Sequence, residues 1–206
     1  VNKLDREGRD PFDVLDELEK ELQINVRPLS WPIEMGDRFK GVYNLYNKSL
    51  DLYQPSKQTV TKSVAIKTLE DERLQKHIGD DLAETLREEV ELITGVYPEF
   101  DRDEYLSGKL APVFFGSALN NFGVKELLDC FVDIAPSPRP IDAEERTVDP
   151  YEEDFSGFVF KIHANMDPNH RSRLAFVKVC SGKFERNVNY KHVRFDRMMR
   201  FSSPTA

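Results

Sequence analysis

The sequence predicts an α/β unit followed by an all-β unit, and three observations support this fold class. A short apolar run, Pro112 to Phe115, precedes a turn and then a helical pattern from Val124 to Ile134, an order typical of α/β domains. A proline-rich and acidic stretch over residues 136–154 predicts a linker, because nothing in it favours a core. Beyond the linker, four short strand-like runs with polar turns predict a β-barrel over residues 155–206. No strand follows to close this barrel, so we expect it to be incomplete.

Length and composition limit the kind of protein. The chain has 206 residues, of which 39% are hydrophobic and 32% charged, which fits one large or two modest globular domains. No apolar run approaches the length of a membrane span, and no signal peptide is visible. Cys130 and Cys180 lie far apart and predict buried thiols in a reducing compartment. The four histidines show no ligand spacing with each other or with the cysteines, so the sequence proposes no metal ligands.

The first helix of the α/β part has a clear start. Asp10 and Pro11 form a helix cap followed by a first-turn proline. Five apolar residues then recur on one face, and the stripe ends near Ile24; they are Phe12, Val14, Leu15, Leu18 and Leu22. In such a fold the next strand after this helix would be the one that ends at Phe115. A helical crossover between two parallel strands needs only about a dozen residues, far fewer than lie between Ile24 and Phe115. The long interval therefore predicts a folded insertion at about residues 30–110.

The insertion has mixed periodicity. Phe39–Leu45 and Leu50–Tyr53 predict two strands joined by a hairpin turn, and the β-branched run Thr59–Ile66 predicts a third. Asp71–Ile93 has an apolar residue every four positions, which predicts one long amphipathic helix with an acidic outer face. That face indicates either a solvated surface or a docking surface for a partner. A short helix is expected at Asp101–Leu106.

Charge is unevenly divided along the chain. Residues 155–206 contain ten Lys and Arg against three Asp and Glu, a net charge of +7. Residues 1–154 contain nineteen against thirty-four, a net charge of −15. A basic segment behind an acidic one is typical of contact with nucleic acid through one face. The alternative is a small β domain that carries Lys and Arg on its exposed strands.

The strongest functional motif is the tetrapeptide Asn2-Lys3-Leu4-Asp5. Asn-Lys-x-Asp is the pattern with which GTP-binding proteins read the guanine base. The Asp carboxylate can accept both the ring N–H and the exocyclic amino group of guanine, a donor pair that adenine lacks. The Lys stem can lie along the base, the Asn amide can tie the loop to neighbouring backbone, and Leu4 supplies spacing and an apolar anchor.

A second loop supports this interpretation. Gly116-Ser117-Ala118-Leu119 follows the predicted strand and precedes the predicted helix. At this place GTP-binding proteins direct a backbone N–H at the guanine carbonyl oxygen, and here that group would belong to Ala118. The alternative is an ordinary strand-to-helix loop of an α/β domain.

The sequence lacks a phosphate-binding loop. Such a loop has the pattern Gly-x-x-x-x-Gly-Lys-Ser/Thr, and the two Gly-Lys pairs, Gly108-Lys109 and Gly182-Lys183, have neither the upstream glycine nor the following hydroxyl. We therefore expect the chain to be the back half of a nucleotide-binding domain, with base specificity but without an assignable catalytic residue or metal ligand.

Several longer motifs resemble one family. They are Arg9–Pro11, Trp31–Gly36, Phe39–Tyr43, Phe115–Val124, Phe155–Ile162, Ala164–Pro168 and the pair His170-Arg171. Together with Asn-Lys-Leu-Asp they resemble the peptide chain release factor 3 family, bacterial translational GTPases related to elongation factor G. The resemblance covers essentially the whole chain.

This resemblance implies a fold and an activity. The fold would be the C-terminal part of a P-loop-type G domain over residues 1–135 with an inserted α+β subdomain, the linker, and a partial translation-factor β-barrel. The intact parent would be a cytoplasmic GTPase that uses GTP and Mg²⁺, works on the ribosome and promotes the release of class I release factors. The fragment alone would be inactive and would hold no cofactor. No membrane partner is implied, and the oligomeric state stays open. Two alternatives are an elongation-factor-type translocase and an RNA-binding module with a relic guanine site.

The resemblance also implies site residues. Asn2, Lys3, Leu4 and Asp5 map onto the base-reading motif, and Ser117, Ala118 and Leu119 map onto the second guanine-contacting loop. The family's barrel faces the small ribosomal subunit, so His170, Arg171 and Arg173 are candidates for contact with RNA phosphate. A solvated hairpin loop is the alternative for these three residues.

Overall fold

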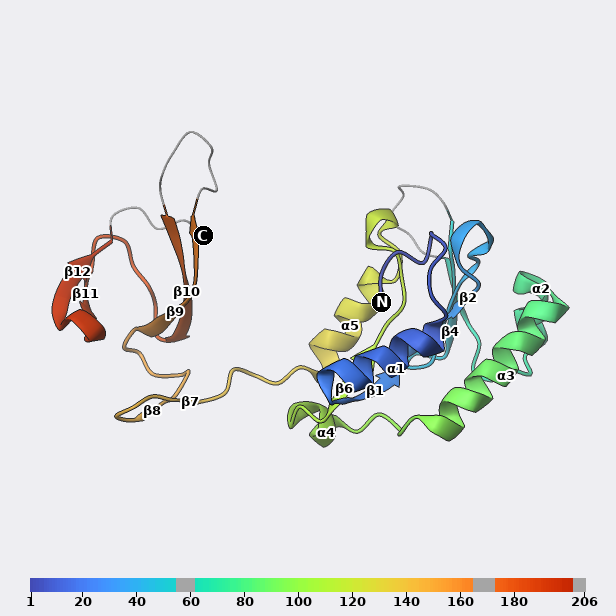
Figure 1. Cartoon of the computed structure of the whole chain (residues 1–206), viewed down its shortest axis with the longest axis horizontal. Helices are drawn as coiled ribbons and strands as arrows, with labels where there is room; N and C mark the ends of the chain where they lie inside the picture. Colours follow the sequence, from blue (N-terminus) through green and yellow to red (C-terminus); the bar gives the residue numbers. More distant parts are fainter. Residues whose placement is uncertain (55–61, 165–172, 202–206) are drawn as a thin grey trace. The chain divides into compact units, whose positions relative to one another are not determined.

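A computed structural model of the chain describes residues 1–54, 62–164 and 173–201. The chain divides into two compact units, Val1–Ala135 and Pro136–Ala206, which we call unit 1 and unit 2 (Figure 1). Each unit is described by itself below.

Unit 1 opens with the loop 1–10 and helix α1 (Pro11–Leu22). The Asp10 carboxylate accepts a hydrogen bond from the Phe12 N–H at 2.8 Å, and Pro11 occupies a position whose N–H needs no partner. The helix therefore begins where the sequence predicts. Strand β1 (Asn25–Pro28) follows and pairs in parallel with β6 (Leu110–Val113). Strand β1 was not predicted, because it is only four residues long and has no clear alternation of apolar and polar residues.

The predicted insertion contains a four-stranded antiparallel sheet in the order β2-β3-β4-β5. Its strands are β2 (Ser30–Ile33), β3 (Gly41–Asn44), β4 (Ser49–Leu52) and β5 (Lys62–Ala65). The short helix η1 (Gly36–Arg38) lies between β2 and β3. The sequence predicted β3, β4 and β5; residues 59–61 of the predicted third strand lie outside the described residues.

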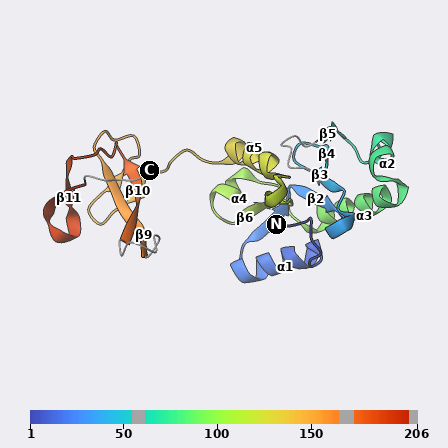
Figure 2. The ribbon, with the colours of Figure 1, turned by 90° about the horizontal axis from the view of Figure 1, so that it is seen from above.

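The two faces of this sheet differ in character. Trp31, Tyr43 and Leu50 are paired across neighbouring strands, and all three belong to the main hydrophobic core with residues of α2 and α3. The opposite face carries Asn44 and Asp51 together with the apolar Val42, since side chains alternate along a strand and Val42 is the cross-strand partner of Asp51. Seen along two directions, α2 and α3 lie on one side of the sheet and α5 on the other (Figures 1 and 2).

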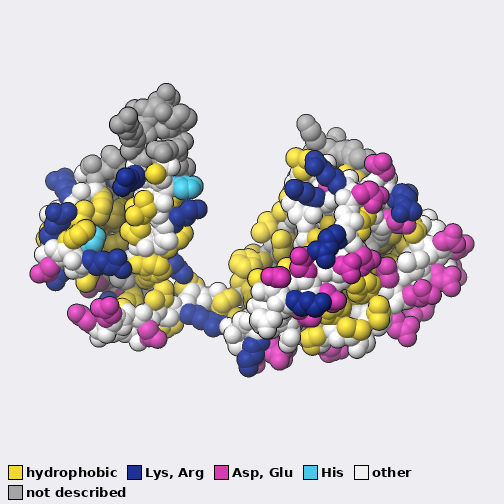
Figure 3. Space-filling model, viewed as in Figure 1, with side chains coloured by type: hydrophobic (Ala, Val, Ile, Leu, Met, Phe, Trp, Pro, Cys, Tyr) yellow, Lys and Arg dark blue, Asp and Glu magenta, His cyan; other side chains and the backbone are white. Residues whose placement is uncertain are grey.

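The predicted helix over Asp71–Ile93 is two helices, α2 (Glu72–Ile78) and α3 (Asp80–Val96). The break is at Gly79, whose φ is +91°, a left-handed value that ends α2. The apolar period is continuous through the break, so the pattern alone did not reveal it. The acidic side chains of these two helices gather on their outer surface in Figure 3.

The chain returns through α4 (Arg102–Leu106), β6, the short helix η2 (Ala118–Asn120) and α5 (Val124–Ile134). Helix α5 contributes Cys130 and Ile134 to a second small core. Its remaining apolar stripe is exposed: Leu127, Leu128, Phe131 and Val132 are between 43% and 79% accessible. Helix α5 is thus where the sequence predicts it, but the described residues cover only part of its apolar surface.

Unit 2 is built from strands. The linker region contains a small hairpin of β7 (Ile141–Asp142) and β8 (Thr147–Val148), with Val148 buried. The long strands β9 (Ser156–Ala164) and β10 (Arg173–Ser181) form an antiparallel pair, and β11 (Asn189–His192) pairs with β12 (Arg197–Arg200) across the short helix η3 (Val193–Phe195). The described strands thus form separate two-stranded sheets and no barrel, in contrast to the prediction. Strand periodicity predicts individual strands, but it does not determine whether distant strands pair.

Candidate functional site

The two loops singled out in the sequence lie side by side. The Val1 amino group donates to the Phe114 carbonyl at 2.6 Å, and the Gly116 N–H donates to the Val1 carbonyl at 3.1 Å. This is the bonding pattern of two parallel strands. The Leu4 N–H then donates to the Gly116 carbonyl at 3.1 Å. More than a hundred residues of chain separate these partners, and three backbone hydrogen bonds join them.

Val1 and strand β1 pair with opposite edges of the same extended segment, which contains β6 and continues to Gly116. The Leu29 N–H bonds the carbonyl of Val113, whereas Val1 uses groups of Phe114 and Gly116. Consecutive residues of a strand direct their hydrogen-bonding groups to opposite edges. The extended segment that leads from β6 into the second loop is therefore hydrogen-bonded to β1 on one edge and to Val1 on the other. These bonds fix the place at which the second loop begins.

Asn2 connects the two loops. Its Oδ1 accepts hydrogen bonds from the Lys3 N–H at 2.7 Å and from the Ala118 N–H at 2.9 Å. The tie to neighbouring backbone expected of this amide is therefore present. Asn2 Oδ1 thus accepts from the Ala118 N–H, the group predicted to donate to the guanine carbonyl oxygen. A base that uses this N–H would have to displace the Asn2 side chain.

Asp5 and Ser117 form the second side-chain bridge. The Ser117 hydroxyl donates to Asp5 Oδ1 at 2.5 Å, and the amide of Asn120 donates to the Ser117 Oγ at 2.9 Å. Ser117 is only 1% exposed and is locked by reciprocal backbone hydrogen bonds with Phe122. This chain of contacts fixes the direction of the Asp5 carboxylate.

The backbone around the second loop has little space. A Cβ atom at Gly116 would lie 2.5 Å from the Phe122 carbonyl oxygen, so only glycine fits where the loop folds back on itself. Asn120 and Phe122 were not among the predicted site residues. Their signal in the sequence is weak, since Asn-Asn-Phe-Gly indicates only a turn.

The remaining predicted base-site residues lie at the ends of the two loops. Leu4 is 6% exposed and belongs to the main core, so it anchors the first loop as predicted from its apolar character. Lys3 is exposed and has a left-handed φ of 75°. Leu119 is 79% exposed. The structure thus brings Asn2, Asp5, Ser117 and Ala118 into one hydrogen-bonded group, with Lys3 and Leu119 open to solvent.

The candidates for RNA contact are only partly described. Arg173 is the first residue of β10, opposite Ala164, and it is exposed. His170 and Arg171 lie outside the described residues. Lys and Arg side chains are spread over the visible surface of unit 2 in Figure 3.

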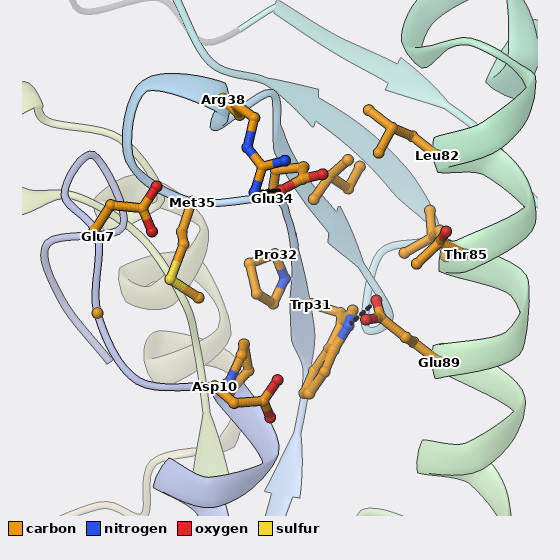
Figure 4. A pocket seen from close by; sticks show the side chains of 14 residues that line it. Glu7, Asp10, Trp31, Pro32, Glu34, Met35, Arg38, Leu82, Thr85 and Glu89 are labelled. Carbon is orange, nitrogen blue, oxygen red and sulfur yellow. Dashed lines mark hydrogen bonds and ion pairs between the residues drawn. The ribbon is translucent and has the colours of Figure 1, made fainter.

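A groove of about 370 Å³ lies next to the first loop, between β2, α3 and the chain that leads into α1 (Figure 4). Trp31 and Pro32 form part of its wall, and Glu7, Asp10, Glu34 and Glu89 supply four carboxyl groups. The Trp31 indole N–H donates to Glu89 Oε2 at 2.8 Å. Burial raises the pKa of Glu89; the Trp31 hydrogen bond opposes this change, and Asp10 and Glu34 add to it.

Within residues 1–54, 62–164 and 173–201, no group of three or more His, Cys, Asp or Glu side chains is arranged to hold a metal ion. The same residues contain no helix that combines the length and hydrophobicity needed to cross a membrane.

Comparison with known families gives a match for the C-terminal segment. Residues 154–206 match the family model described as elongation factor G domain 2. The match supports a translation-factor GTPase family. The intact members of this elongation-factor-G-like family are GTP-binding proteins that act on the ribosome in protein biosynthesis. The matched residues coincide with most of the β-rich unit 2, so the fold and the family model agree at the level of class.

Proposed function

We propose that unit 1 contains the guanine-reading part of the nucleotide-binding domain of a ribosome-associated GTPase, and that the parent protein acts in translation termination by promoting release of class I release factors. The observation that carries the first part is the hydrogen-bonded group of Asn2, Asp5, Ser117 and Ala118. The elongation factor G domain 2 match supports the GTPase family. The termination step rests on the longer motifs that resemble release factor 3.

The proposed reading of the base follows from the geometry. Ser117 holds one oxygen of the Asp5 carboxylate, so the carboxylate is preorganised to accept the ring N–H and the exocyclic amino group of guanine. The guanine carbonyl oxygen takes the Ala118 N–H in place of Asn2 Oδ1. Adenine would leave the Asp5 carboxylate unpaired, which costs more than a missing contact. The exposed stem of Lys3 is free to lie along the base.

Affinity for the whole nucleotide needs more than this site. Phosphate and Mg²⁺ contacts normally supply most of the binding energy in such proteins, and the sequence has no phosphate loop. The exposed apolar stripe of α5 supports packing against further elements of a nucleotide-binding domain. In this proposal the 206-residue chain supplies base specificity, GDP and Mg²⁺ bind only to the intact parent, and the 206-residue chain alone hydrolyses no GTP.

The test is a calorimetric titration of GDP with Mg²⁺ into this chain and into the parent protein. We expect binding by the parent and negligible binding by the 206-residue chain. In the parent, Asp5→Asn should shift preference from guanine towards xanthine nucleotides, because the amide can donate to the oxygen that replaces the exocyclic amino group. Asp13→Asn, an exposed change in α1, is the matched control. Unchanged base preference in Asp5→Asn would remove Asp5 from the site, and tight GDP binding by the 206-residue chain would mean that phosphate is recognised elsewhere.

The basic charge of residues 155–206 favours one second candidate, an RNA-binding module with a relic guanine site. It predicts salt-sensitive RNA binding that is lost when Arg171 and Arg173 are replaced by alanine. Binding that is insensitive to these changes would leave this alternative without support.

A further inference from the structure

One short segment of the insertion contacts the first loop of the proposed guanine site. Gly36 begins η1, and its N–H donates to the Leu4 carbonyl at 2.9 Å. Phe39 ends the same turn, and its N–H donates to the Gly36 carbonyl at 3.2 Å. Leu4 and Phe39 belong to the same hydrophobic core. The insertion is therefore hydrogen-bonded to the loop that carries Asn2 and Asp5.

Three aromatic rings make the contact with the second loop. The Phe122 ring lies 5.5 Å from the Phe39 ring at an interplanar angle of 88°, and 5.4 Å from the Tyr53 ring at 84°. The Phe39 and Tyr53 rings lie 5.0 Å apart. Edge-to-face contact at these centroid distances is a favourable arrangement of aromatic side chains. These three residues, which we call the aromatic trio, join the inserted sheet to the turn that follows the second loop.

Two rings of the trio are held by the hairpin of β3 and β4. Phe39 comes shortly before β3 and Tyr53 directly after β4, at the end of the hairpin where Gly41 pairs with Leu52. The Tyr53 N–H donates to the Lys40 carbonyl at 2.8 Å. The backbone of the inserted sheet therefore fixes the place of both rings, and the third ring packs on them.

Phe122 connects the trio to the hydrogen-bonded group of the guanine site. Its N–H donates to the Ser117 carbonyl at 2.9 Å, and the Ser117 N–H donates to the Phe122 carbonyl at 3.0 Å. Phe122 is 4% exposed and Ser117 is 1% exposed. The Ser117 hydroxyl in turn donates to Asp5 Oδ1. A displacement of the Phe122 ring would therefore move the serine that orients the Asp5 carboxylate.

We propose that the inserted sheet braces the guanine site: the aromatic trio positions Ser117 and, through Ser117, the Asp5 carboxylate. Reading guanine with a carboxylate requires a fixed direction of its two oxygens, which depends on the residues packed behind it. The members of the trio are positioning residues because they act through Ser117. The effect on base selection rests on the proposed function, whereas the coupling of the inserted sheet to the second loop does not.

The first test is amide hydrogen exchange in the 206-residue chain without nucleotide. Tyr53→Leu removes two of the three ring contacts and keeps an apolar side chain. We expect the Ser117 and Phe122 amides to exchange about tenfold faster in this variant. Tyr53→Phe, which keeps the ring, should restore the natural rates. Tyr105→Leu, which removes a ring contact with Phe100 instead, is the matched control. Unchanged exchange at Ser117 and Phe122 in Tyr53→Leu would overturn the brace.

The second test compares GDP with inosine diphosphate in the parent protein. Inosine diphosphate lacks the exocyclic amino group and so makes one hydrogen bond fewer with Asp5. Tyr53→Leu should weaken GDP binding more than inosine diphosphate binding, because the lost contact depends on the direction of the carboxylate. A general loss of folded protein would weaken both alike, so equal losses would overturn the positioning role. A natural parent without preference for GDP would refute the proposed function, and the exchange rates would still decide the brace.

A third measurement needs no variant and covers the case in which Tyr53→Leu does not fold. In the natural chain, exchange is followed at increasing urea concentrations below the unfolding transition. The amides of Gly36, Tyr53, Ser117 and Phe122 should open together with one urea dependence, because the brace makes them one cooperative unit. Opening of Ser117 and Phe122 at lower urea than Gly36 and Tyr53 would show an independent loop and would overturn the brace.

Discussion

At the residue scale, the contact of Trp31 with Glu89 shows how a single hydrogen bond joins the inserted sheet to its covering helix. Trp31 is 1% exposed and lies in the core between Phe12 and Phe115. Its indole N–H would be an unsatisfied buried donor without Glu89, a loss that typically costs about 1–3 kcal/mol. Glu89 is therefore held in a half-buried position, where burial raises its pKa, the Trp31 hydrogen bond opposes the rise, and the carboxyl groups of Asp10 and Glu34 add to it.

This contact predicts a pH-dependent signal from the single tryptophan of the chain. Because the pKa of Glu89 is raised, its stabilising contribution is present below 4.5 and is lost as pH rises through the raised pKa. Trp31 emission should therefore change with pH in that range. The change should disappear in Glu89→Gln, which still accepts the indole hydrogen bond, and should persist in Glu84→Gln, an exposed change in α3. A titration that survives in Glu89→Gln would assign the signal to another group.

At the element scale, the break between α2 and α3 depends on one glycine. Gly79 ends α2 with an N–H donated to the Gln75 carbonyl, and its own carbonyl accepts from Ala83 at the start of α3. Its φ of +91° is accessible to glycine and strained for other residues. A Cβ atom there would meet no other atom within 4 Å, so any effect of substitution comes from the backbone.

We expect Gly79→Ala to lower the free energy of unfolding by about 1–3 kcal/mol. Gly95→Ala is a matched control, since Gly95 lies inside α3, also with no atom within 4 Å of its Cβ position. That change should be neutral or stabilising by up to about 1 kcal/mol, as alanine is the better helix former. Urea unfolding of both variants measures the difference. Equal effects of the two substitutions would contradict a conformational role for Gly79.

At the scale of the whole molecule, the two units differ in how they bury apolar surface. The two hydrophobic cores found in the described residues belong to unit 1. In unit 2 the long hairpin of β9 and β10 exposes apolar side chains along its length, including Phe158, Phe160, Ile162, Leu174 and Phe176. Exposed apolar surface of this extent typically marks an interaction site or an unfilled core.

The proposed role in termination predicts a difference between two ribosome assays. The parent protein with GTP should release a bound class I release factor from the ribosome and should not move tRNA. An elongation-factor-type translocase would give the reverse result. Asp5→Asn should abolish release with GTP and restore it with xanthosine triphosphate, which ties the effect to the guanine site. Movement of tRNA by the natural protein would exclude the termination proposal.

The features that were predicted correctly depend on residues that are close together in the sequence. Asp10 and Pro11 fix the start of α1 because the cap and the first-turn proline act within one turn. The hairpin of β3 and β4 and the helix α5 follow from short-range periodicity. The guanine site stays a prediction: the polar side chains of Asn-Lys-Leu-Asp have the donors and acceptors that it needs in any fold, whereas Ala118 would contribute a backbone N–H, whose direction depends on the fold.

Other features were decided by the tertiary structure, since they depend on partners far apart in sequence. The strand β1 exists because β6, some eighty residues later, offers a parallel edge. The engagement of the Ala118 N–H by Asn2 and the bridge from Ser117 to Asp5 join residues more than a hundred positions apart. Sequence fixes which groups can ionise or form hydrogen bonds, and only the fold decides which of them are buried together.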